Sequence, residues 1–477
     1  MLFYGNNVMK IHLIAAALIA VFIFILSTAY ADLICVGCLT GWPQKIIGDG
    51  TSSPAIGDID NDGDLEYVMG GGYGDNRIYA WHYNGTLIKG WPKVTGGYVI
   101  SSPALADIDN DGDLEIFVGS YDGKVYGFHH NGKLVRGWPK QTYGKVYSSP
   151  AIGDIDNDGD LEIAVGVADK NTKQFYVWHH NGTIVRGFPK TVVNRNGLTQ
   201  AGWGQFYQTP ALADLDGDGK LEIIIGNDNA NVYIWRYNGR NFPGWPQNVG
   251  DRRAHLSSPA IGDIDGDGDL EIVMGADDGY DRTEGVVYAW HRNGSIVSGW
   301  PNYVSYGPVN TPIALGDIDS DGRLEIFAGT IDDKLYAWHD NGTYVWTNGY
   351  RELVDDKGLG YSANGAVIAD INHDNYPEVL LSTYYLNWPG NPEYGKIFAF
   401  DRNGNKVPGF PKALPNMALY SIISINDLDG DGDIDLSGGS KEFAYVMDLN
   451  TSRYNATNVE WGMRGHDVRH TGLYTRN

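Results

Sequence analysis

The chain has 477 residues, including 64 glycines, 31 tyrosines and 14 tryptophans, and its formal net charge is −24. A chain this acidic repels phosphate backbones, so the composition argues against a nucleic-acid partner. The length alone is compatible with two or three domains, or with one large all-β domain.

The first segment, residues 1–31, is typical of an export signal. Residues 1–10 carry one positive charge, residues 11–29 are nearly all apolar, and Ala29-Tyr30-Ala31 has the small-x-small pattern of a cleavage site. The apolar run is also long enough to span a bilayer, so an uncleaved N-terminal membrane anchor is the alternative. In either case we expect the rest of the chain to be secreted or held at the cell surface, and to meet a membrane only through this segment.

Two cysteines, Cys35 and Cys38, are the only ones in the sequence. A CxxC pair outside the cytoplasm is expected to form a small local disulfide, because a redox or metal role would bring a neighbouring helix or further ligands. Six sequons would suit surface glycosylation in a host that performs it, although four of them are also hairpin turns: Asn84, Asn181, Asn293, Asn341, Asn450 and Asn455.

A nine-residue acidic motif, Asp-Ile-Asp-Asn-Asp-Gly-Asp-Leu-Glu, begins at Asp58. Calcium takes six to eight oxygen ligands from carboxylates, carbonyls and water. The side chains of Asp58, Asp60 and Asp62 can each direct one oxygen inward, and the glycine at position 6 allows the loop to double back. The carbonyl of Asp64 can add another oxygen, and Glu66 can close the site. Because two carboxylates 4 Å apart repel by about 4 kcal/mol at an effective dielectric of 20, the motif predicts a bound calcium ion.

The motif recurs seven more times at spacings of 47 to 60 residues, which indicates a repeat architecture. The eight copies hold 36 of the 59 acidic residues, so the net charge is mainly a property of these loops. The further copies begin at Asp107, Asp154, Asp214, Asp263, Asp317, Asp370 and Asp427.

Each copy lies in a unit of four predicted strands. In the second unit, residues 101–106 lead into the acidic motif, and we expect strands at 114–118, 124–129 and 134–138. An Asn-Gly turn at Asn131 separates the last two, and Asn-Gly between alternating runs is a strong hairpin signal. Four short strands per unit at this period predict the blades of an all-β propeller.

Eight acidic motifs predict eight four-stranded antiparallel blades, with a seven-bladed ring as the alternative. A fourth-strand aromatic of the Gly-Trp-Pro type follows seven of the motifs, and the eighth, Gly41-Trp42-Pro43, precedes the first motif. We therefore expect the N-terminal strand around Trp42 to complete the last blade, whose other strands lie in 418–450. Such closure removes both sheet edges. The tail around Trp461 is the competitor for that place.

The unit Ser-Ser-Pro-Ala-Ile-Gly followed by the acidic motif resembles the FG-GAP (VCBS-type) repeats of integrin α-subunit propellers and of many secreted microbial proteins. The segment from Trp461 to Gly472 is similar to the terminal segment of secreted microbial members. The resemblance implies a propeller over residues 32–456, a tail at 457–477 packed on it, and up to eight structural Ca²⁺ bound between strands 1 and 2 of each blade. By position, the implied ligands are Asp58, Asp60, Asp62, Asp64, Glu66, Asp107, Asp109, Asp111, Asp113, Glu115, Asp154, Asp156, Asp158, Asp160, Glu162, Asp214, Asp216, Asp218, Lys220, Glu222, Asp263, Asp265, Asp267, Asp269, Glu271, Asp317, Asp319, Asp321, Arg323, Glu325, Asp370, Asn372, Asp374, Glu378, Asp427, Asp429, Asp431, Asp433 and Asp435.

The seventh copy departs from the pattern. Asn375 replaces the glycine, and asparagine tolerates the left-handed region well enough to keep the turn. Asn372 keeps an oxygen but loses a charge, so we expect this calcium site to be the weakest.

The predicted topology separates two faces. The acidic motifs and the Asn-Gly turns share one face, and long connections, where function usually lies, gather on the other: 190–208, 248–257, 275–286, 348–365 and 382–396. As a group, their rings and polar groups make that face the candidate site for a protein or glycan ligand, although single rings can simply pack loop against loop. The residues are Trp203, Phe206, Tyr207, Tyr280, Tyr350, Tyr361, Tyr384, Tyr385, Trp388, Tyr394, Arg252, Arg253 and His255.

Histidines recur before the Asn-Gly turns, and we interpret them as hairpin packing because they lie on separate blades. His466 and His470 lack a third metal ligand. The recurring set is His82, His130, His180, His291 and His339.

The leading functional prediction is a non-catalytic, calcium-stabilised module for adhesion or recognition, with no catalytic residues. The main alternative is an enzyme acting on polysaccharides, because rhamnogalacturonan lyases also use an eight-bladed calcium propeller. An architectural protein of the cell envelope is a third alternative.

Overall fold

The computed structural model describes residues 35–474 except for 169–173, 193–205, 250–254, 278–283, 305–306, 310, 357–358, 386–393 and 419. The predicted export signal or anchor at residues 1–31 lies outside this part of the chain, as do Trp203, Arg252, Arg253, Tyr280 and Trp388. Within the described ranges, no helix is long and apolar enough to cross a bilayer.

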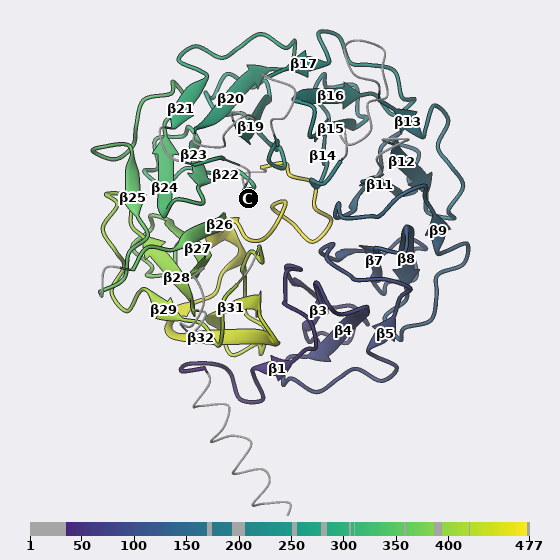
Figure 1. The fold of residues 1–477 in the computed structure, drawn as a ribbon, viewed down its shortest axis with the longest axis horizontal. Coiled ribbons are helices and arrows are strands. Elements are labelled where there is room, and N and C mark those ends of the chain that lie inside the picture. Colours follow the sequence, from purple (N-terminus) through teal and green to yellow (C-terminus); the bar gives the residue numbers. More distant parts are fainter. Residues whose placement is uncertain are drawn as a thin grey trace, which may run out of the picture.

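The described strands form eight antiparallel sheets arranged like blades around a common centre (Figure 1). Six consist only of strands that follow one another in the chain, the seventh adds a strand from the tail, and the eighth joins the two ends of the propeller. In chain order the blades are β2 (Ala55–Gly57), β3 (Glu66–Gly70), β4 (Arg77–His82) and β5 (Lys93–Val94); β6 (Ala104–Ala106), β7 (Glu115–Gly119), β8 (Lys124–Phe128) and β9 (Lys140–Gln141); β10 (Ala151–Gly153), β11 (Glu162–Gly166), β12 (Gln174–His179) and β13 (Lys190–Thr191); β14 (Ala211–Ala213), β15 (Glu222–Gly226), β16 (Asn231–Trp235) and β17 (Gln247–Asn248); β18 (Ala260–Gly262), β19 (Glu271–Asp277), β20 (Gly285–His291) and β21 (Asn302–Val304); β22 (Ala314–Gly316), β23 (Glu325–Gly329), β24 (Lys334–Trp338) and β25 (Tyr350–Glu352); β26 (Ser362–Ala369), β27 (Glu378–Tyr385), β28 (Tyr394–Phe400) and β29 (Lys412–Ala413), with β33 (Val459–Trp461) as a fifth strand; and β30 (Ser424–Asn426), β31 (Asp433–Ser440), β32 (Phe443–Arg453) and β1 (Gln44–Lys45).

The hydrophobic core lies between the blades. Successive side chains of a strand point to opposite faces of its sheet. In β7, Ile116 therefore packs with Val68 of the first blade, and Phe117 packs with Ile163 of the third. Each second strand is buried on both faces, which explains its continuous apolar sequence.

The N-terminal strand closes the ring, as predicted. Gln44 and Lys45 of β1 pair with Ala444 and Phe443 of β32, so the first described strand completes the last blade. This pairing and the eight sheets confirm the eight-bladed ring. The competing segment lies elsewhere, because Trp461 of β33 pairs with Ile368 at the inner edge of the seventh blade.

The predicted position of the fourth strand was wrong. In the second blade it was expected at 134–138, but β9 begins only after Pro139. Trp138 instead lies in the turn before β9, where its indole Nε1 donates a hydrogen bond to the carbonyl of His180 in the next blade, at 3.1 Å. Trp138 therefore serves a contact between blades, whereas Leu134 forms a single antiparallel bridge with Phe128 of its own blade.

This contact is repeated around the ring. Trp42 Nε1 donates to the carbonyl of Tyr83 at 2.7 Å, which joins the last blade to the first. A Cβ on Gly41 would lie 2.1 Å from the carbonyl oxygen of Asn84, so only glycine permits this approach. The Gly-Trp-Pro and Asn-Gly signals are thus two halves of one joint. Other donors and acceptors are Trp91 and His130, Trp245 and Arg292, Trp300 and Asp340, and Trp346 and Arg402.

The tail, residues 459–474, occupies the centre of the ring (yellow in Figure 1). The middle N–H groups of five inner strands donate to its carbonyls, so the tail covers strand edges that would otherwise be unpaired. The donor–acceptor pairs, 2.7 to 2.9 Å apart, are Leu105 and Val468, Ile152 and Arg469, Leu212 and Thr471, Ile261 and Gly472, and Ile425 and Gly462.

His470 holds the tail against the segment that precedes β10. Its ring is 1% exposed, and Nδ1 lies 2.9 Å from the carbonyl of Pro150. Burial lowers the pKa of His470 to about 4, so the ring is neutral and its Nδ1–H donates a hydrogen bond to that carbonyl.

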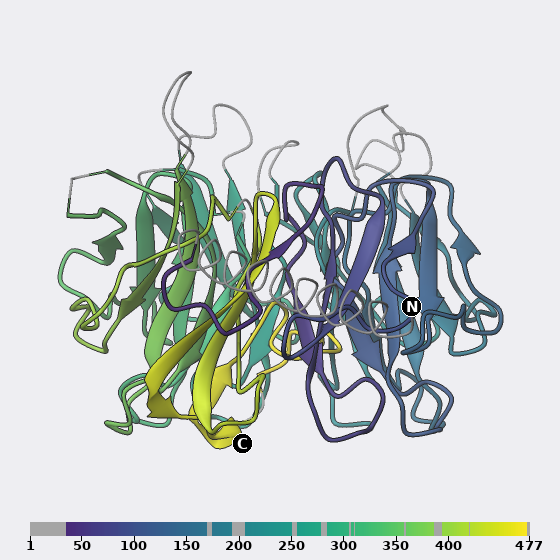
Figure 2. The same ribbon diagram turned by 90° about the horizontal axis from the view of Figure 1, so that it is seen from below.

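Figure 2 shows the ring from the side, with strands running between two faces. Because each acidic motif follows an inner strand, all eight motifs lie on one face, which we call the motif face. The connections between strands 2 and 3, and from one blade to the next, lie on the other, which we call the pocket face. The disulfide between Cys35 and Cys38 forms as predicted.

Candidate functional site

The acidic motifs are held in shape by their own backbone. In the first copy, both oxygens of Asp58 accept hydrogen bonds, from the N–H groups of Asp62 at 3.1 Å and Gly63 at 3.0 Å. Gly63 has a φ of 97°, as predicted, and Asn61 also lies in the left-handed region, with a φ of 55°. Two left-handed residues let the loop double back around the first aspartate.

The acidic residue at position 9 is buried and lies against the base of the loop. Glu66 is 0% exposed; its Oε2 accepts the N–H of Ile59 at 3.0 Å, and its Oε1 lies 3.3 Å from His82 Nδ1. Both oxygens therefore already have a polar partner. The bond to the position-2 N–H occurs in all eight loops, through Glu66, Glu115, Glu162, Glu222, Glu271, Glu325, Glu378 and Asp435.

The histidines before the Asn-Gly turns belong to these loops, so the interpretation as hairpin packing was incomplete. Glu66 and His82 are opposite residues in the register of β3 and β4, which brings their side chains together. His130 and His180 were assigned to this position but lie one residue beyond it, beside Asp113 and Asp160. The pairs in the other four blades, 2.9 to 3.1 Å apart, are His129 and Glu115, His179 and Glu162, His291 and Glu271, and His339 and Glu325.

The carboxylates of several loops form clusters of negative charge that would suit a bound cation. Asp60 Oδ1 is buried without a hydrogen-bond donor, and the oxygens of Asp58, Asp60 and Asp62 converge within 4.8 Å. Burial and then the charges of these aspartates raise the pKa of Glu66 to about 8. An all-oxygen cluster of this kind suits calcium better than softer metals. Orphan oxygens also belong to Asp156 and Asp216 at the same position of their motifs, and to Asp370 and Asp427 at position 1.

Three loops differ from the rest, and the eighth has Asp435 at position 9, opposite Asp448 of β32. In the fourth blade, Arg236 replaces the histidine, and its guanidinium reaches Asp216 Oδ2 at 2.6 Å and Asp218 Oδ2 at 3.5 Å. This loop thus contains its own cation, which competes with a metal ion. In the seventh, Asn375 has a φ of 67°, and Asn372 Nδ2 donates to Glu378 Oε1 at 2.6 Å.

The position-7 residues Lys220 and Arg323 turn their side chains away from their loops. Lys220 Nζ donates to the carbonyl of Asp156 in the preceding blade at 2.7 Å, and Arg323 pairs with Asp340. Only their backbone carbonyls remain available to a cation, which is the role predicted for position 7.

A pocket of about 460 Å³ opens on the pocket face near the centre of the ring, and we call it the mouth pocket. Its walls come from the segments just before the inner strands, including Thr51, Ile100, Tyr147 and Tyr207. Because these segments converge at the axis, the pocket combines residues from blades far apart in sequence. The tail contributes Arg464.

Five tyrosines form a continuous row beside the mouth pocket across the first four blades. Neighbouring ring centroids are 4.5 to 5.7 Å apart, and Tyr121 donates a hydrogen bond to the hydroxyl of Tyr73 at 3.1 Å. Tyr73 and Tyr98 are 40% and 43% exposed. This tyrosine row consists of Tyr73, Tyr98, Tyr121, Tyr147 and Tyr207.

Three of the five predicted aromatic residues whose side chains the structure describes are buried. Phe206, Tyr361 and Tyr384 are 0%, 1% and 4% exposed and belong to the core, which is the packing alternative stated above. Tyr350 packs against Tyr336 of its own blade, with centroids 5.4 Å apart. Of the predicted set, Tyr207 and His255 line the mouth pocket, and the side chains of Tyr385 and Tyr394 lie outside the described residues.

The tyrosine row was missed because four of its members lie in short turns rather than in insertions. A sequence signal does exist: Tyr147 directly precedes Ser-Ser-Pro, and Tyr207 stands at the same place before Gln-Thr-Pro. A tyrosine directly before the Ser-Ser-Pro segment of the repeat therefore indicates a residue of the mouth pocket.

His255 lines the mouth pocket with an oriented ring. Its Nδ1 lies 2.9 Å from Asp277 Oδ2, and Asp277 is 2% exposed. Asp277 Oδ1 also accepts the backbone N–H of His255 at 2.8 Å. In the neutral ring, this carboxylate favours the tautomer with the proton on Nδ1, which leaves a lone pair on Nε2.

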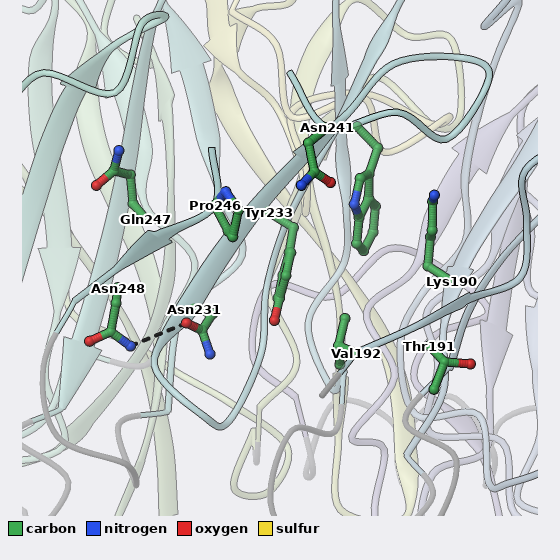
Figure 3. A pocket seen from close by; sticks show the side chains of 10 residues that line it. Lys190, Thr191, Val192, Asn231, Tyr233, Asn241, Pro246, Gln247 and Asn248 are labelled. Atoms are coloured by element: carbon green, nitrogen blue, oxygen red, sulfur yellow. Dashed lines mark hydrogen bonds between the residues drawn. The ribbon is translucent and has the colours of Figure 1, made fainter. Parts of the chain in front are cut away.

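A second hollow, of about 520 Å³, lies at the outer side of the third and fourth blades (Figure 3). Lys190 and Thr191 come from β13, and Asn231 and Asn248, whose amides are hydrogen-bonded at 3.2 Å, come from β16 and β17. Its wall carries polar side chains and two aromatic rings. It is formed by two neighbouring blades, whereas residues from many blades line the mouth pocket.

A comparison with known protein families gives matches that cover repeated acidic motifs. The FG-GAP-like repeat matches residues 58–118, 107–165, 214–274 and 317–381, and each match begins at the first aspartate of an acidic motif. The chain belongs to the FG-GAP-repeat β-propellers.

Relatives of this FG-GAP propeller include two lambda-carrageenases. It is 34% identical over 115 residues to one from Pseudoalteromonas sp and 33% identical over 115 residues to one from Pseudoalteromonas carrageenovora. Each alignment covers 20% of this chain and 12% of the relative, so the chain matches only a small part of those proteins.

Solved structures share the fold of the FG-GAP propeller at low identity. The V. cholerae biofilm matrix protein Bap1 aligns with a TM-score of 0.61 and 13% identity over 92% of this chain and 96% of that one. The rhamnogalacturonan lyase of Bacillus licheniformis aligns with a TM-score of 0.56 and 15% identity over 93% and 81%. These likenesses show the fold alone.

Proposed function

We propose that this FG-GAP propeller is an extracytoplasmic recognition module that binds a polysaccharide along the tyrosine row and in the mouth pocket. The observation that carries the proposal is the row itself: five adjoining rings, two of them well exposed, beside an open pocket. Binding sites typically combine apolar and aromatic walls with a few polar groups. Sugar rings offer C–H faces to aromatic rings and hydroxyl groups to polar neighbours such as His255.

We further propose that the eight motifs bind structural calcium. The buried carboxylate oxygens without donors and the convergence of three aspartates support this assignment. Extracellular calcium-binding modules have dissociation constants of about 10⁻⁴–10⁻³ M. Calcium sites of this kind fit a protein that is exported by the signal expected at residues 1–31. The name of one structural neighbour, a biofilm matrix protein, and those of the polysaccharide-degrading relatives also favour a location outside the cytoplasm.

Replacing Tyr147 with alanine is expected to weaken polysaccharide binding about tenfold, because its ring links Tyr121 to Tyr207 in the middle of the row. The measurement is affinity electrophoresis or calorimetry against a panel of soluble polysaccharides. Tyr143→Ala is the matched control, since Tyr143 is 74% exposed and takes no part in the ring contacts that the described residues form along the row. The proposal fails if the wild-type protein binds no member of the panel, or if both variants bind alike.

A second candidate function is cleavage of the bound polysaccharide. The His255–Asp277 pair favours it, because a histidine oriented by a buried carboxylate can accept a proton at Nε2. If the propeller is an enzyme, we expect new reducing ends to appear from a bound polysaccharide and His255→Ala to abolish them while the variant still binds. Unchanged chain length for every polysaccharide that binds would rule this candidate out and leave recognition as the function.

A further inference from the structure

The tail places one guanidinium in the mouth pocket. Arg464 lines the pocket, remains partly exposed, and donates from Nε to Thr209 Oγ1 at 3.3 Å. No carboxylate among the described residues forms an ion pair with it. Burial lowers the pKa of Arg464 to about 10, with no acidic neighbour acting in the opposite direction, so the group stays charged at neutral pH.

The surroundings of Arg464 do not supply a compensating charge. On the tail, His470 is neutral because burial lowers its pKa to about 4. Asp467 already accepts hydrogen bonds from the N–H and hydroxyl groups of Thr471 and lies 3.9 Å from His466 Nδ1. Asp277, behind the pocket wall, already accepts two hydrogen bonds from His255. A partly desolvated guanidinium without an anion is costly, in a protein whose net charge is −24. Such a group is better explained by a ligand that brings the anion.

Arg464 is also held firmly in place. The backbone on both sides of it is bound by inner strands, through Gly462 to Ile425 and through Val468 to Leu105. A planar guanidinium fixed in this way can offer paired N–H donors to a carboxylate or a sulfate. Fixing the donor in advance also reduces the ordering cost of binding.

We infer that Arg464 makes the mouth pocket selective for an acidic polysaccharide, by binding a carboxylate or sulfate group on one of its sugars. This inference rests on the proposed function, because it presupposes that a polysaccharide enters the pocket. It adds the class of ligand and the residue that selects it. The tyrosine row binds sugar rings in general, and Arg464 distinguishes the charged ones.

The test compares ligands and variants together. The ligands are a uronate polymer and its methyl ester, and a sulfated galactan and its desulfated form. The wild-type protein is expected to bind at least one acidic polymer about 10- to 100-fold more tightly than its neutral partner. Arg464→Gln is expected to remove this preference, to keep binding of the neutral form, and to make the affinity less sensitive to salt.

Arg469→Gln is the matched control, because Arg469 is an exposed arginine of the same tail and the change in charge is identical. Preference for the uronate polymer alone identifies a carboxylate as the ligand, and preference for the sulfated galactan alone identifies a sulfate. Equal binding of charged and neutral polymers by the wild-type protein overturns the inference and leaves polysaccharide binding intact. Equal behaviour of the two variants also overturns it, whereas absence of all binding overturns the proposed function as well. If Arg464→Gln does not fold, the comparison of the wild-type ligands still decides.

Discussion

Chelation of calcium with excess EGTA is expected to lower the melting temperature of the propeller sharply. With ambient calcium tenfold above Kd, each site adds about 1.4 kcal/mol to the free energy of unfolding. Eight sites would together add roughly 11 kcal/mol, which is comparable to the 5–15 kcal/mol that stabilises a typical domain. The loops with Arg236 in the fourth blade and Asn372 in the seventh are expected to contribute least.

Differential scanning calorimetry with and without EGTA measures this effect. Restoring calcium should restore the melting temperature, whereas the same concentration of magnesium should not, because Mg²⁺ demands a tighter octahedral shell and gives up its water reluctantly. A melting temperature that is the same in EGTA and in excess calcium would refute a structural role for the ion.

Replacing Trp42 with alanine is expected to cost about 3–5 kcal/mol of unfolding free energy. Trp42 is 1% exposed, packs against Tyr67 and Trp81 with centroids 4.9 and 5.8 Å away, and bonds to the carbonyl of Tyr83. Trp42 lies between β1, which belongs to the last blade, and the first blade, so it stands at the point where the ring closes. Losing this side chain therefore weakens both the local core and the joint between the two ends of the propeller.

The matched control is Trp245→Ala, which removes the same kind of side chain and the same type of indole bond, to Arg292, within the ring. Both variants should lose stability in chemical denaturation. Only Trp42→Ala should also lose hydrogen-exchange protection at Gln44–Lys45, because Trp42 anchors the segment next to the two-residue strand β1 in the core. Full protection of β1 in that variant would show that closure does not depend on Trp42.

Features that repeat along the chain could be predicted from the sequence. The spacing of the acidic motifs determines the number of blades, and the unmatched Gly41-Trp42-Pro43 predicts closure by the N-terminal strand. Each unit gives the same signal, so one unit confirms the next. The positions of the aspartates in their loops follow for the same reason.

Features formed between distant units were not predictable in the same way. The tail attaches through main-chain carbonyls, such as those of Val468 and Gly472, and carbonyl groups leave no trace in a sequence. The tyrosine row depends on the curvature of the ring, which brings Tyr121 and Tyr207 near one another only after the blades assemble. Long connections drew attention instead, although Phe206 in one of them is a core residue.

The tail has a consequence for symmetry. Eight similar blades make a ring with approximate eightfold rotational symmetry, and a site on the axis of such a ring would look alike from eight directions. A polysaccharide chain has a direction, so a symmetric site could not fix its polarity. The tail crosses the centre once and is not repeated, and the tyrosine row covers the first four blades only. Together they break the symmetry where a ligand would bind, so a polymer could be held in one orientation.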